Sequence, residues 1–373
     1  MNTKSFWPNT TKTPSSRVWR AALKGFLFGL LFFYHVPYGI ARDSIKIVAY
    51  NVENLFDTIP AQEHNDQEFS PGGVKHWNKQ RYYTKIRKIA RVLTDIGQWS
   101  YPDLIGLCEI EGDSVVRHLS RAPGLRGGSY EYAVSSGRDA RGIEVALLWN
   151  SRQFALISQK EIPTYITGSL PPWYAPTDTL AFHTQGYAGR NVLWVTLARY
   201  SDHTRWHVFV VHAPSRRNGI KQTNPNRIQL CQRVRSATDS IRANTPNDYI
   251  VIMGDFNDNP NSPSLLTGLQ ATLLQHYNSS SPPVLVNISP LPTATQGSHL
   301  FRGRYWMPDQ IILSHHFFRN RIPEQYPKLH IFTPKYLWEP SARLRKRPKR
   351  TYRGNFYSSG YSDHFPVYTT LYL

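Results

Sequence analysis

Apolar and polar positions along the chain alternate in two ways, one typical of strands and one typical of helices. Short apolar or β-branched runs bounded by turn residues predict strands. These runs cover residues 44–51, 104–110, 130–135, 144–149, 191–200, 206–212, 249–253, 309–314 and 365–372. Apolar residues recur at helical spacing through 80–96, with basic residues between them, and helices are also predicted at 113–120 and 223–244.

The order of these elements predicts the fold class. Strands and helices alternate, yet the runs at 191–200 and 206–212 predict a hairpin. This mixture favours an α/β (α+β) protein with mixed sheets covered by helices. Because no repeat and no shift in composition marks a boundary, we expect residues 42–373 to form one domain.

Residues 1–41 differ from the rest of the chain and are expected to be a targeting segment. Five basic residues precede an apolar run at 25–34, which is shorter than the roughly 20 residues needed to cross a bilayer. A basic segment, a short apolar run and small residues near Ala41 are typical of a cleaved secretory signal, which predicts a secreted or periplasmic protein. The alternative is an uncleaved membrane anchor, because the basic segment is long.

The net charge favours polyanionic partners. The chain has 44 Lys and Arg against 25 Asp and Glu, a formal charge of +19. Such a balance attracts nucleic acid, anionic lipid or phosphorylated substrates, and the alternative is that it only keeps the protein soluble. Basic residues crowd 343–353 with aromatic residues around them, which suits a phosphate backbone with stackable bases. A solvated charged loop is the alternative for that segment.

The two cysteines, Cys108 and Cys231, exclude a disulfide framework in a chain of 373 residues. Cys108 lies in a predicted strand and Cys231 on the apolar face of a predicted helix, so both are expected to be small core residues. A single bridge between them stays open, and neither has the spacing of a zinc site.

Polar residues that suit phosphate chemistry lie where the predicted strands begin or end. They are Asn51, Glu53, Glu109, His212, Asp255, Asn257, Asp309, Asp363 and His364. Because of these positions, one sheet edge could gather them all. A phosphodiester repels an attacking oxygen, and a hard divalent cation neutralises that charge. Carboxylate and amide oxygens without cysteine suit Mg²⁺, Mn²⁺ or Ca²⁺ better than zinc.

Six short motifs resemble the ordered motif series of the endonuclease/exonuclease/phosphatase superfamily, the DNase-I-like fold. They read YNVEN (50–54), IGLCE (105–109), VHAPSR (211–216), GDFN (254–257), DQII (309–312) and SDHFPV (362–367). The resemblance spans roughly 44–373. It implies a four-layer sandwich, two mixed β-sheets packed face to face with helices on the outside, and a divalent-metal-dependent phosphoester hydrolase.

The resemblance also implies a metal site. Glu109 is similar to the principal metal ligand of the superfamily, helped by Asn51, Glu53 and Asp363. The implied cofactor is Mg²⁺, or Mn²⁺ or Ca²⁺ in its place.

Four further residues match the positions that carry the reaction in the superfamily. Asp255 resembles the residue that activates or orients the attacking water, and Asn257 the residue that positions this water or the phosphate. By the same resemblance, His364 would contact the scissile phosphate. Asp309 would hydrogen-bond the imidazole and fix its tautomer.

The nuclease branch of the superfamily suggests additional positions. His212 is similar to its second histidine, and Glu144 falls where that branch keeps a carboxylate partner, although a solvent-facing strand Glu is the alternative. Ser215, Arg216 and Arg141 are expected to bind phosphate.

The motifs found here belong to the chemistry that the whole superfamily shares, so they do not identify the substrate. The basic charge and the loop at 343–353 favour a nucleic-acid backbone. We therefore expect a secreted, monomeric, Mg²⁺-dependent nuclease that meets a membrane only through an uncleaved segment 1–41. The alternatives are a phosphatase or a phospholipid or sphingomyelin-type phosphodiesterase, and a non-catalytic binding module, which would lack the catalytic residues found here.

Overall fold

The structure is a computed structural model, and it describes Met1 and residues 43–61, 64–137, 139–164, 189–217, 219–340 and 346–373. The chain divides into Met1–Asp43 and Ser44–Leu373, and every helix and strand described belongs to the second unit. The predicted targeting segment lies outside the described residues except for Met1. Among the described helices, none combines the length and the apolar character needed to cross a membrane.

The first large sheet is mixed and contains the first strand of the unit. Its strands lie in the order β14 (His330–Ile331), β17 (Val367–Tyr372), β1 (Ser44–Leu55), β2 (Leu104–Ile110), β4 (Glu144–Asn150) and β3 (Tyr130–Val134). Strands β1 and β2 run parallel, and all other neighbours in this sheet are antiparallel.

The second large sheet is also mixed. Its order is β5 (Phe154–Ile162), β6 (Val192–Arg199), β7 (Arg205–His212), β8 (Tyr249–Asp255), β13 (Asp309–Ser314), β10 (Leu285–Asn287) and β9 (Thr272–Leu273). The pairs β7–β8 and β10–β9 are parallel. Two small hairpins join β11 (His299–Phe301) to β12 (Arg304–Trp306), and β15 (Tyr352–Arg353) to β16 (Phe356–Tyr357).

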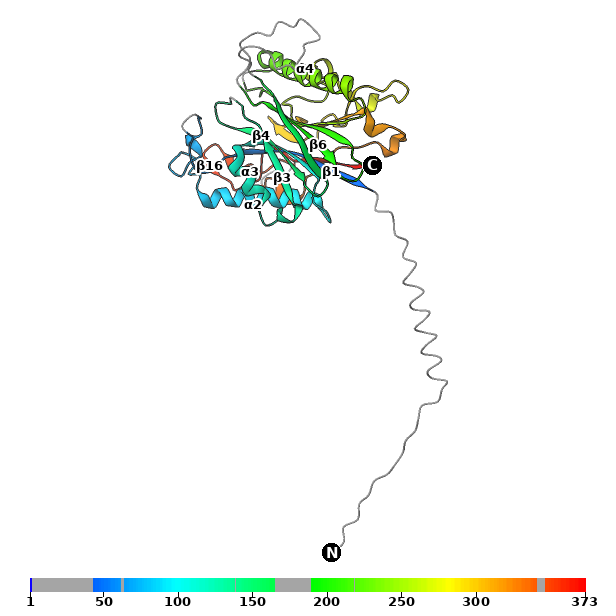
Figure 1. Cartoon of the computed structure of the whole chain (residues 1–373). Coiled ribbons are helices and arrows are strands. Elements are labelled where there is room, and N and C mark those ends of the chain that lie inside the picture. Colours follow the sequence, from blue (N-terminus) through cyan, green and yellow to red (C-terminus); the bar gives the residue numbers. More distant parts are fainter. Residues whose placement is uncertain (2–42, 62–63, 138, 165–188, 218, 341–345) are drawn as a thin grey trace. The chain divides into compact units, whose positions relative to one another are not determined.

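Helices cover the outer faces of both sheets (Figure 1). Helices α2 (Lys79–Gly97) and α3 (Gly112–Ser120) pack on the first sheet, and α4 (Ile220–Asn244) packs on the second. The α2 helix begins where the Asn78 side chain accepts a hydrogen bond from the Arg81 backbone N–H, a normal N-cap. The predicted four-layer sandwich of two mixed sheets with outer helices is therefore confirmed.

Successive side chains of β1 point to opposite faces of the sheet, which explains why layers pack on both sides of it. Ile45, Ile47 and Ala49 lie in the core between the two sheets, which also contains Val208 and Met253 of the second sheet. The intervening side chains of β1 point to the other face and pack with α2 and α3 in a second core. Both cysteines are buried and unbridged, so their interpretation as core residues is confirmed.

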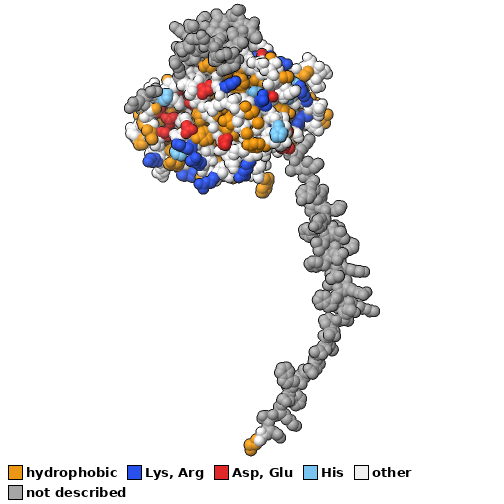
Figure 2. Space-filling view, viewed as in Figure 1, with side chains coloured by type: hydrophobic (Ala, Val, Ile, Leu, Met, Phe, Trp, Pro, Cys, Tyr) orange, Lys and Arg blue, Asp and Glu red, His pale blue; other side chains and the backbone are white. Residues whose placement is uncertain are grey.

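Short helical turns connect the main elements. They are η1 (Gln67–Phe69), η2 (Arg126–Gly128), η3 (Ser264–Gly268), η4 (Leu274–His276), η5 (His315–Phe318), η6 (Pro323–Gln325) and η7 (Lys335–Leu337). Lys and Arg side chains gather on the surface over α2 (Figure 2), where Lys79, Arg87 and Arg91 are exposed. This agrees with the predicted basic solvent face for Arg87 and Arg91, whereas Lys85 of the same predicted face is buried and its Nζ donates to the Glu53 backbone carbonyl.

Candidate active site

The predicted site residues come together from the edges of both sheets rather than from one. In the second sheet, the register pairs Asp255 with His212 on one side and with Asp309 on the other. In the first sheet, Asn51 lies beside Cys108, so Glu109 follows at the same edge. The expectation of a single sheet edge was therefore wrong, because the sandwich brings two edges face to face.

Several residues near the site have backbone conformations that residues other than glycine rarely adopt. Glu53, Glu109 and Asn257 have φ values of 53°, 66° and 50°, in the left-handed region. The β2 ladder is irregular at Glu109, and such a bulge turns a side chain away from the regular pleat. Gly254 has φ of 132°, and a Cβ there would collide with the Val211 carbonyl, so only glycine fits before Asp255. Non-glycine residues held in this region often cluster at functional sites.

His364 and Asp309 form a buried, oriented pair. The distance from His364 Nδ1 to Asp309 Oδ2 is 2.7 Å, and Ser298 Oγ donates to the same carboxylate oxygen at 2.6 Å. Burial alone would lower the pKa of His364, but the carboxylates of Asp309, Asp255 and Asp363 together raise this pKa well above its usual range. These carboxylates therefore favour the protonated ring, and its Nε2 lies 3.9 Å from Asp255 Oδ2.

Asp255 is buried and held on both oxygens. Asn51 Nδ2 donates to its Oδ2 at 2.9 Å, and the backbone N–H of Asn257 donates to its Oδ1 at 2.8 Å. Burial is the main reason that the pKa of Asp255 rises to about 6, while the positive ring of His364 opposes the rise. The Asn257 side chain donates to the Ala213 carbonyl at 3.0 Å, which fixes the turn that carries Asp255.

Glu109 and His212 complete the centre of the site. Asn51 Nδ2 lies 3.4 Å from Glu109 Oε1, and the Asn54 backbone N–H donates to Glu109 Oε2 at 2.8 Å. His212 Nε2 lies 3.7 Å from Asp255 Oδ2 and 4.0 Å from Glu109 Oε1. Burial and the nearby arginines lower the pKa of His212 well below its usual range, so this ring is neutral.

The expected pairing of Glu144 with His212 is not formed. Glu144 accepts hydrogen bonds from Ser135 Oγ and from the Gly137 backbone N–H, both at 2.6 Å, so both of its oxygens are engaged near its own strand. His212 Nδ1 has no hydrogen-bond partner among the residues that the structure describes. Arg190 reaches the His212 backbone carbonyl instead, at 3.3 Å.

Two of the four expected metal ligands are bound by an arginine. Glu53 accepts from Arg350 Nε at 2.9 Å and from the Thr351 backbone N–H at 2.6 Å. Asp363 Oδ2 lies 2.8 Å from Arg350 Nη2. Arg350 therefore links both carboxylates, and each oxygen of Glu53 accepts a hydrogen bond from the segment that carries Arg350.

The three residues expected to bind phosphate differ in their solvent exposure and in their partners. Arg141 is partly exposed, pairs with Asp139 Oδ1 at 3.3 Å and donates to Asn54 Oδ1 at 3.3 Å. Arg216 pairs with buried Asp258, so its charge is already partnered. Ser215 is exposed on the surface next to it.

Sequence reasoning missed His299. Its ring stacks on His364 with centroids 4.4 Å apart and an interplanar angle of 16°. Burial and the positive charge of His364 lower the pKa of His299 to about 3, so it is neutral. The only signal in the sequence is the two-residue turn Arg302-Gly303 between two short aromatic runs, which is typical of a hairpin.

The oxygen donors fit a hard divalent cation. Glu109 Oε1 lies 3.4 Å from Asn51 Nδ2 and 4.0 Å from His212 Nε2, contacts long enough to leave this oxygen available to a cation. The Asn51 amide oxygen, which accepts from the Glu53 backbone N–H at 3.0 Å, is a further neutral oxygen donor. The closest groups of acidic and histidine atoms among the described residues are Asp255–Asp309–His364 and His299–Asp363–His364, each within 4.8 Å. Of these, Asp363 is the carboxylate that belongs to the predicted metal set.

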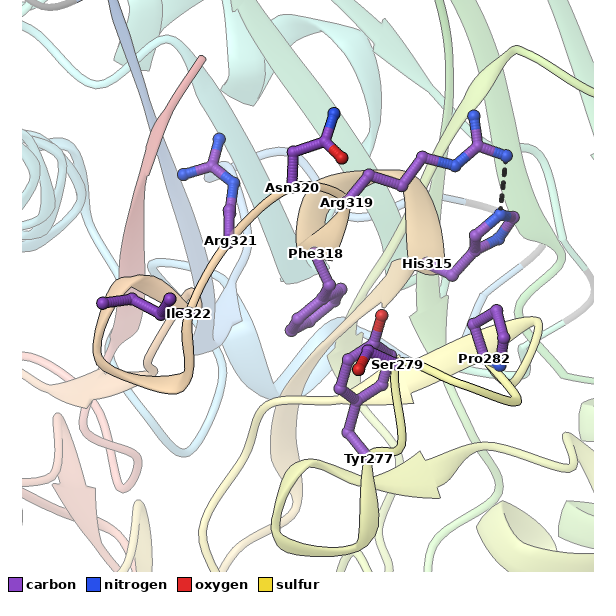
Figure 3. Close-up of a pocket in the computed structure, with 9 residues that line it drawn as sticks. All are labelled: Tyr277, Ser279, Pro282, His315, Phe318, Arg319, Asn320, Arg321 and Ile322. Carbon is purple, nitrogen blue, oxygen red and sulfur yellow. Dashed lines mark hydrogen bonds between the residues drawn. The ribbon is translucent and has the colours of Figure 1, made fainter.

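A separate cavity of about 500 Å³ lies away from this chemistry (Figure 3). Tyr277, Phe318 and Ile322 supply apolar parts of its lining, and Arg319 at its rim contacts His315 at 2.9 Å. The η5 turn follows β13 at Ser314, whereas Asp309 begins the same strand. The cavity is therefore at the opposite end of β13 from the candidate site.

Comparison with known proteins agrees with the fold and the motifs. The model of the Endonuclease/Exonuclease/phosphatase family matches residues 46–372. Truncated TDP2 from Caenorhabditis elegans is similar in structure, with a TM-score of 0.52, 13% identity and coverage of 88% of this chain and 98% of that chain. A mannosyl-6-phosphatase from Bacteroides thetaiotaomicron has a TM-score of 0.52 and 15% identity, covering 87% and 98%. No curated protein matches the sequence.

Proposed function

The chain belongs to the endonuclease/exonuclease/phosphatase family of phosphoester hydrolases, and we propose that it is a divalent-metal-dependent nuclease. The observation that carries the proposal is the convergence of Glu109, Asp255 and the His364–Asp309 pair from two sheet edges. Such a set combines a candidate cation ligand, a carboxylate that can take a proton and a protonated imidazole.

Each group has a task that its surroundings support. A bound divalent cation supplies neutralisation of the phosphate charge, and Glu109 with Asn51 would hold it. Asp255, with a pKa of about 6, is ionised at neutral pH and can orient a water or accept its proton. His364 Nε2 is a charged donor for a phosphoryl oxygen, because Asp309 holds the other ring nitrogen.

Exposed basic residues support a nucleic-acid substrate. In the segment predicted to bind a phosphate backbone, Lys346 and Arg347 are exposed. Arg350 and Arg353 are instead paired with carboxylates, the latter with Glu339. The other arginines of that segment, at 343 and 345, lie outside the described residues. Two exposed cations and a net charge of +19 favour a polyanion over a small neutral ester.

The test is digestion of plasmid DNA and of RNA with Mg²⁺ and with chelator, at several salt concentrations. We expect cleavage that requires the metal and weakens as salt rises, because phosphate contacts compete with counterions. An Asp255→Asn variant serves as the blank. Inertness toward both nucleic acids, with hydrolysis of a sugar phosphate or of sphingomyelin in a parallel assay, would overturn the proposal in favour of a phosphatase or lipid phosphodiesterase.

Export from the cytoplasm is part of the same proposal. The basic and apolar pattern of residues 1–41 supports it. N-terminal sequencing of the protein from a fractionated host would show cleavage near Ala41. Recovery of the intact chain in the membrane fraction would indicate the anchor instead.

A further inference from the structure

The hairpin β11–β12 carries a row of side chains away from the candidate site. Its turn residues Arg302 and Gly303 have φ of 48° and 74°, as a tight two-residue hairpin turn requires. His299 pairs with Trp306, and Phe301 pairs with Arg304. Since side chains alternate along a strand, these four side chains lie on one face of the hairpin.

The other face of the hairpin attaches it to the protein. Tyr305 is buried, and its hydroxyl donates to the Lys346 carbonyl at 2.6 Å. The first strand is joined to the site by a backbone bridge between His299 and His364. The hairpin is thus anchored at the site, and its turn extends outward.

Aromatic rings on the first face follow one another outward from the site. His299 stacks on His364 at 4.4 Å, and the Phe301 ring follows at 6.4 Å from His299 with a tilt of 40°. The Phe301 side chain is 52% exposed, so part of its ring is open to solvent. The outermost of these rings, Phe301, therefore presents an exposed aromatic surface two residues along the chain from His299, which stacks on His364.

Cations flank this surface, and residues 298–306 contain no acid. The Arg302 guanidinium lies 5.3 Å from the Phe301 ring centre, and Arg304 is exposed across the hairpin. Arg216 stacks on Trp306 at 4.4 Å at the other side of the face, with its charge paired to Asp258. Aromatic surface bordered by guanidinium groups is the combination that binds single-stranded nucleic acid.

We propose that this face of the β11–β12 hairpin is a subsite for an unpaired base next to the scissile phosphate, with Phe301 as the stacking platform and Arg302 and Arg304 as contacts for the adjoining backbone. The inference rests on the proposed nuclease function and adds a substrate class, single-stranded nucleic acid. A base inside a duplex is stacked on its neighbours and offers no free face to Phe301.

The test compares a short single strand of normal nucleotides with the same strand in which abasic spacers replace the bases. For Phe301→Ala we expect kcat/KM to fall roughly 5- to 100-fold on the normal strand. We expect less than a twofold change on the abasic strand, and Phe301→Trp should retain the wild-type preference. Tyr200→Ala, which removes another exposed aromatic at the opposite end of the sheet, is the matched control and should change neither value.

Two results would overturn the subsite. An equal loss on both strands would show that Phe301 supports the fold or the chemistry, and no loss on either would show that no base stacks there. The wild-type rate on the normal strand tests the proposed function separately. If that rate is zero, the subsite can still be tested by binding. Fluorescence anisotropy would measure the affinity of Asp255→Asn for each strand in the presence of Mg²⁺, with and without the additional Phe301→Ala change. Equal affinities with and without Phe301→Ala would overturn the subsite.

Discussion

At the scale of single residues, the His364–Asp309 pair makes the clearest prediction. Asp309→Asn keeps the size of the side chain but removes the charge that raises the pKa of His364. We expect kcat to fall about 100-fold or more with little change in KM, because the ring loses its orientation and its proton. Steady-state kinetics and an NMR titration of His364 would check this, with Asp239→Asn as an exposed control. An unchanged His364 titration together with full activity would contradict it.

Glu109→Gln tests the residue that resembles the principal metal ligand. Glu109 is partly exposed at the edge of β2, so the fold should tolerate the isosteric change. We expect turnover to fall about 100-fold or more, and Mg²⁺ binding measured by calorimetry to weaken. Glu131→Gln, an exposed change on β3, should have no effect. A lower melting temperature for Glu109→Gln in place of lower activity would mean that Glu109 is structural.

At the scale of elements, Asp258 connects the loop after β8 to α4. It is buried and pairs with Arg227 at 2.7 Å and with Arg216, and Ser264 Oγ donates to it at 2.6 Å. Asp258→Ala would leave two guanidinium groups without their anion, one of them fully buried. We expect the free energy of unfolding to fall by about 3–5 kcal/mol.

Urea denaturation would measure this loss. The control is Asp239→Ala, which removes the exposed i,i+4 pair with Arg235 on α4 and should cost below about 1 kcal/mol. Equal effects of the two changes would mean that the buried cluster adds nothing beyond a surface pair.

The long elements could be predicted from sequence, whereas the short and edge elements could not. Helix α2 and the strands β2, β7 and β13 were found because periodicity over many residues reports burial. Strand β5 was missed because five of its nine residues carry polar or small side chains and most of it is not buried. The hairpin β11–β12 has strands of three residues, too short to show a period.

Only the site residues that lie at strand ends could be predicted from the sequence. Asp255 and Asp309 are neighbours because their strands pair, which the sequence order allows one to expect. Arg350 could not be placed, because the loop that carries it has no periodic pattern. Since that arginine binds Glu53 and Asp363, the set of free carboxylates could not be predicted either.

At the scale of the whole molecule, the three hydrophobic cores found among the described residues all lie within residues 44–373. We therefore expect a protein that starts at Asp43 to fold with the melting temperature of the full chain. Differential scanning calorimetry of both forms would check this. A loss of several degrees in the shorter form would show that residues 1–42 contribute to the folded unit.

The two sheets are joined near the site by a buried ion pair that makes the molecule sensitive to acid. Asp139, between β3 and β4, pairs with Arg190, before β6, at 2.6 Å, and both are buried. Burial alone would raise the pKa of Asp139, but Arg190 and Arg141 outweigh it and lower this pKa below its ordinary value of 3.8.

The direction of the shift fixes the pH dependence. A carboxyl with a lowered pKa in the folded state adds stability above its unfolded value, and this stability is lost as the pH falls through the folded value. Asp139→Asn should therefore reduce the free energy of unfolding by about 3 kcal/mol at pH 7, and the difference from wild type should shrink below about pH 4. Urea denaturation of both proteins between pH 7 and pH 3 measures the difference. A constant difference across that range would show that the charge of Asp139 is not what joins the two sheets, and that its hydrogen bonds alone account for the effect.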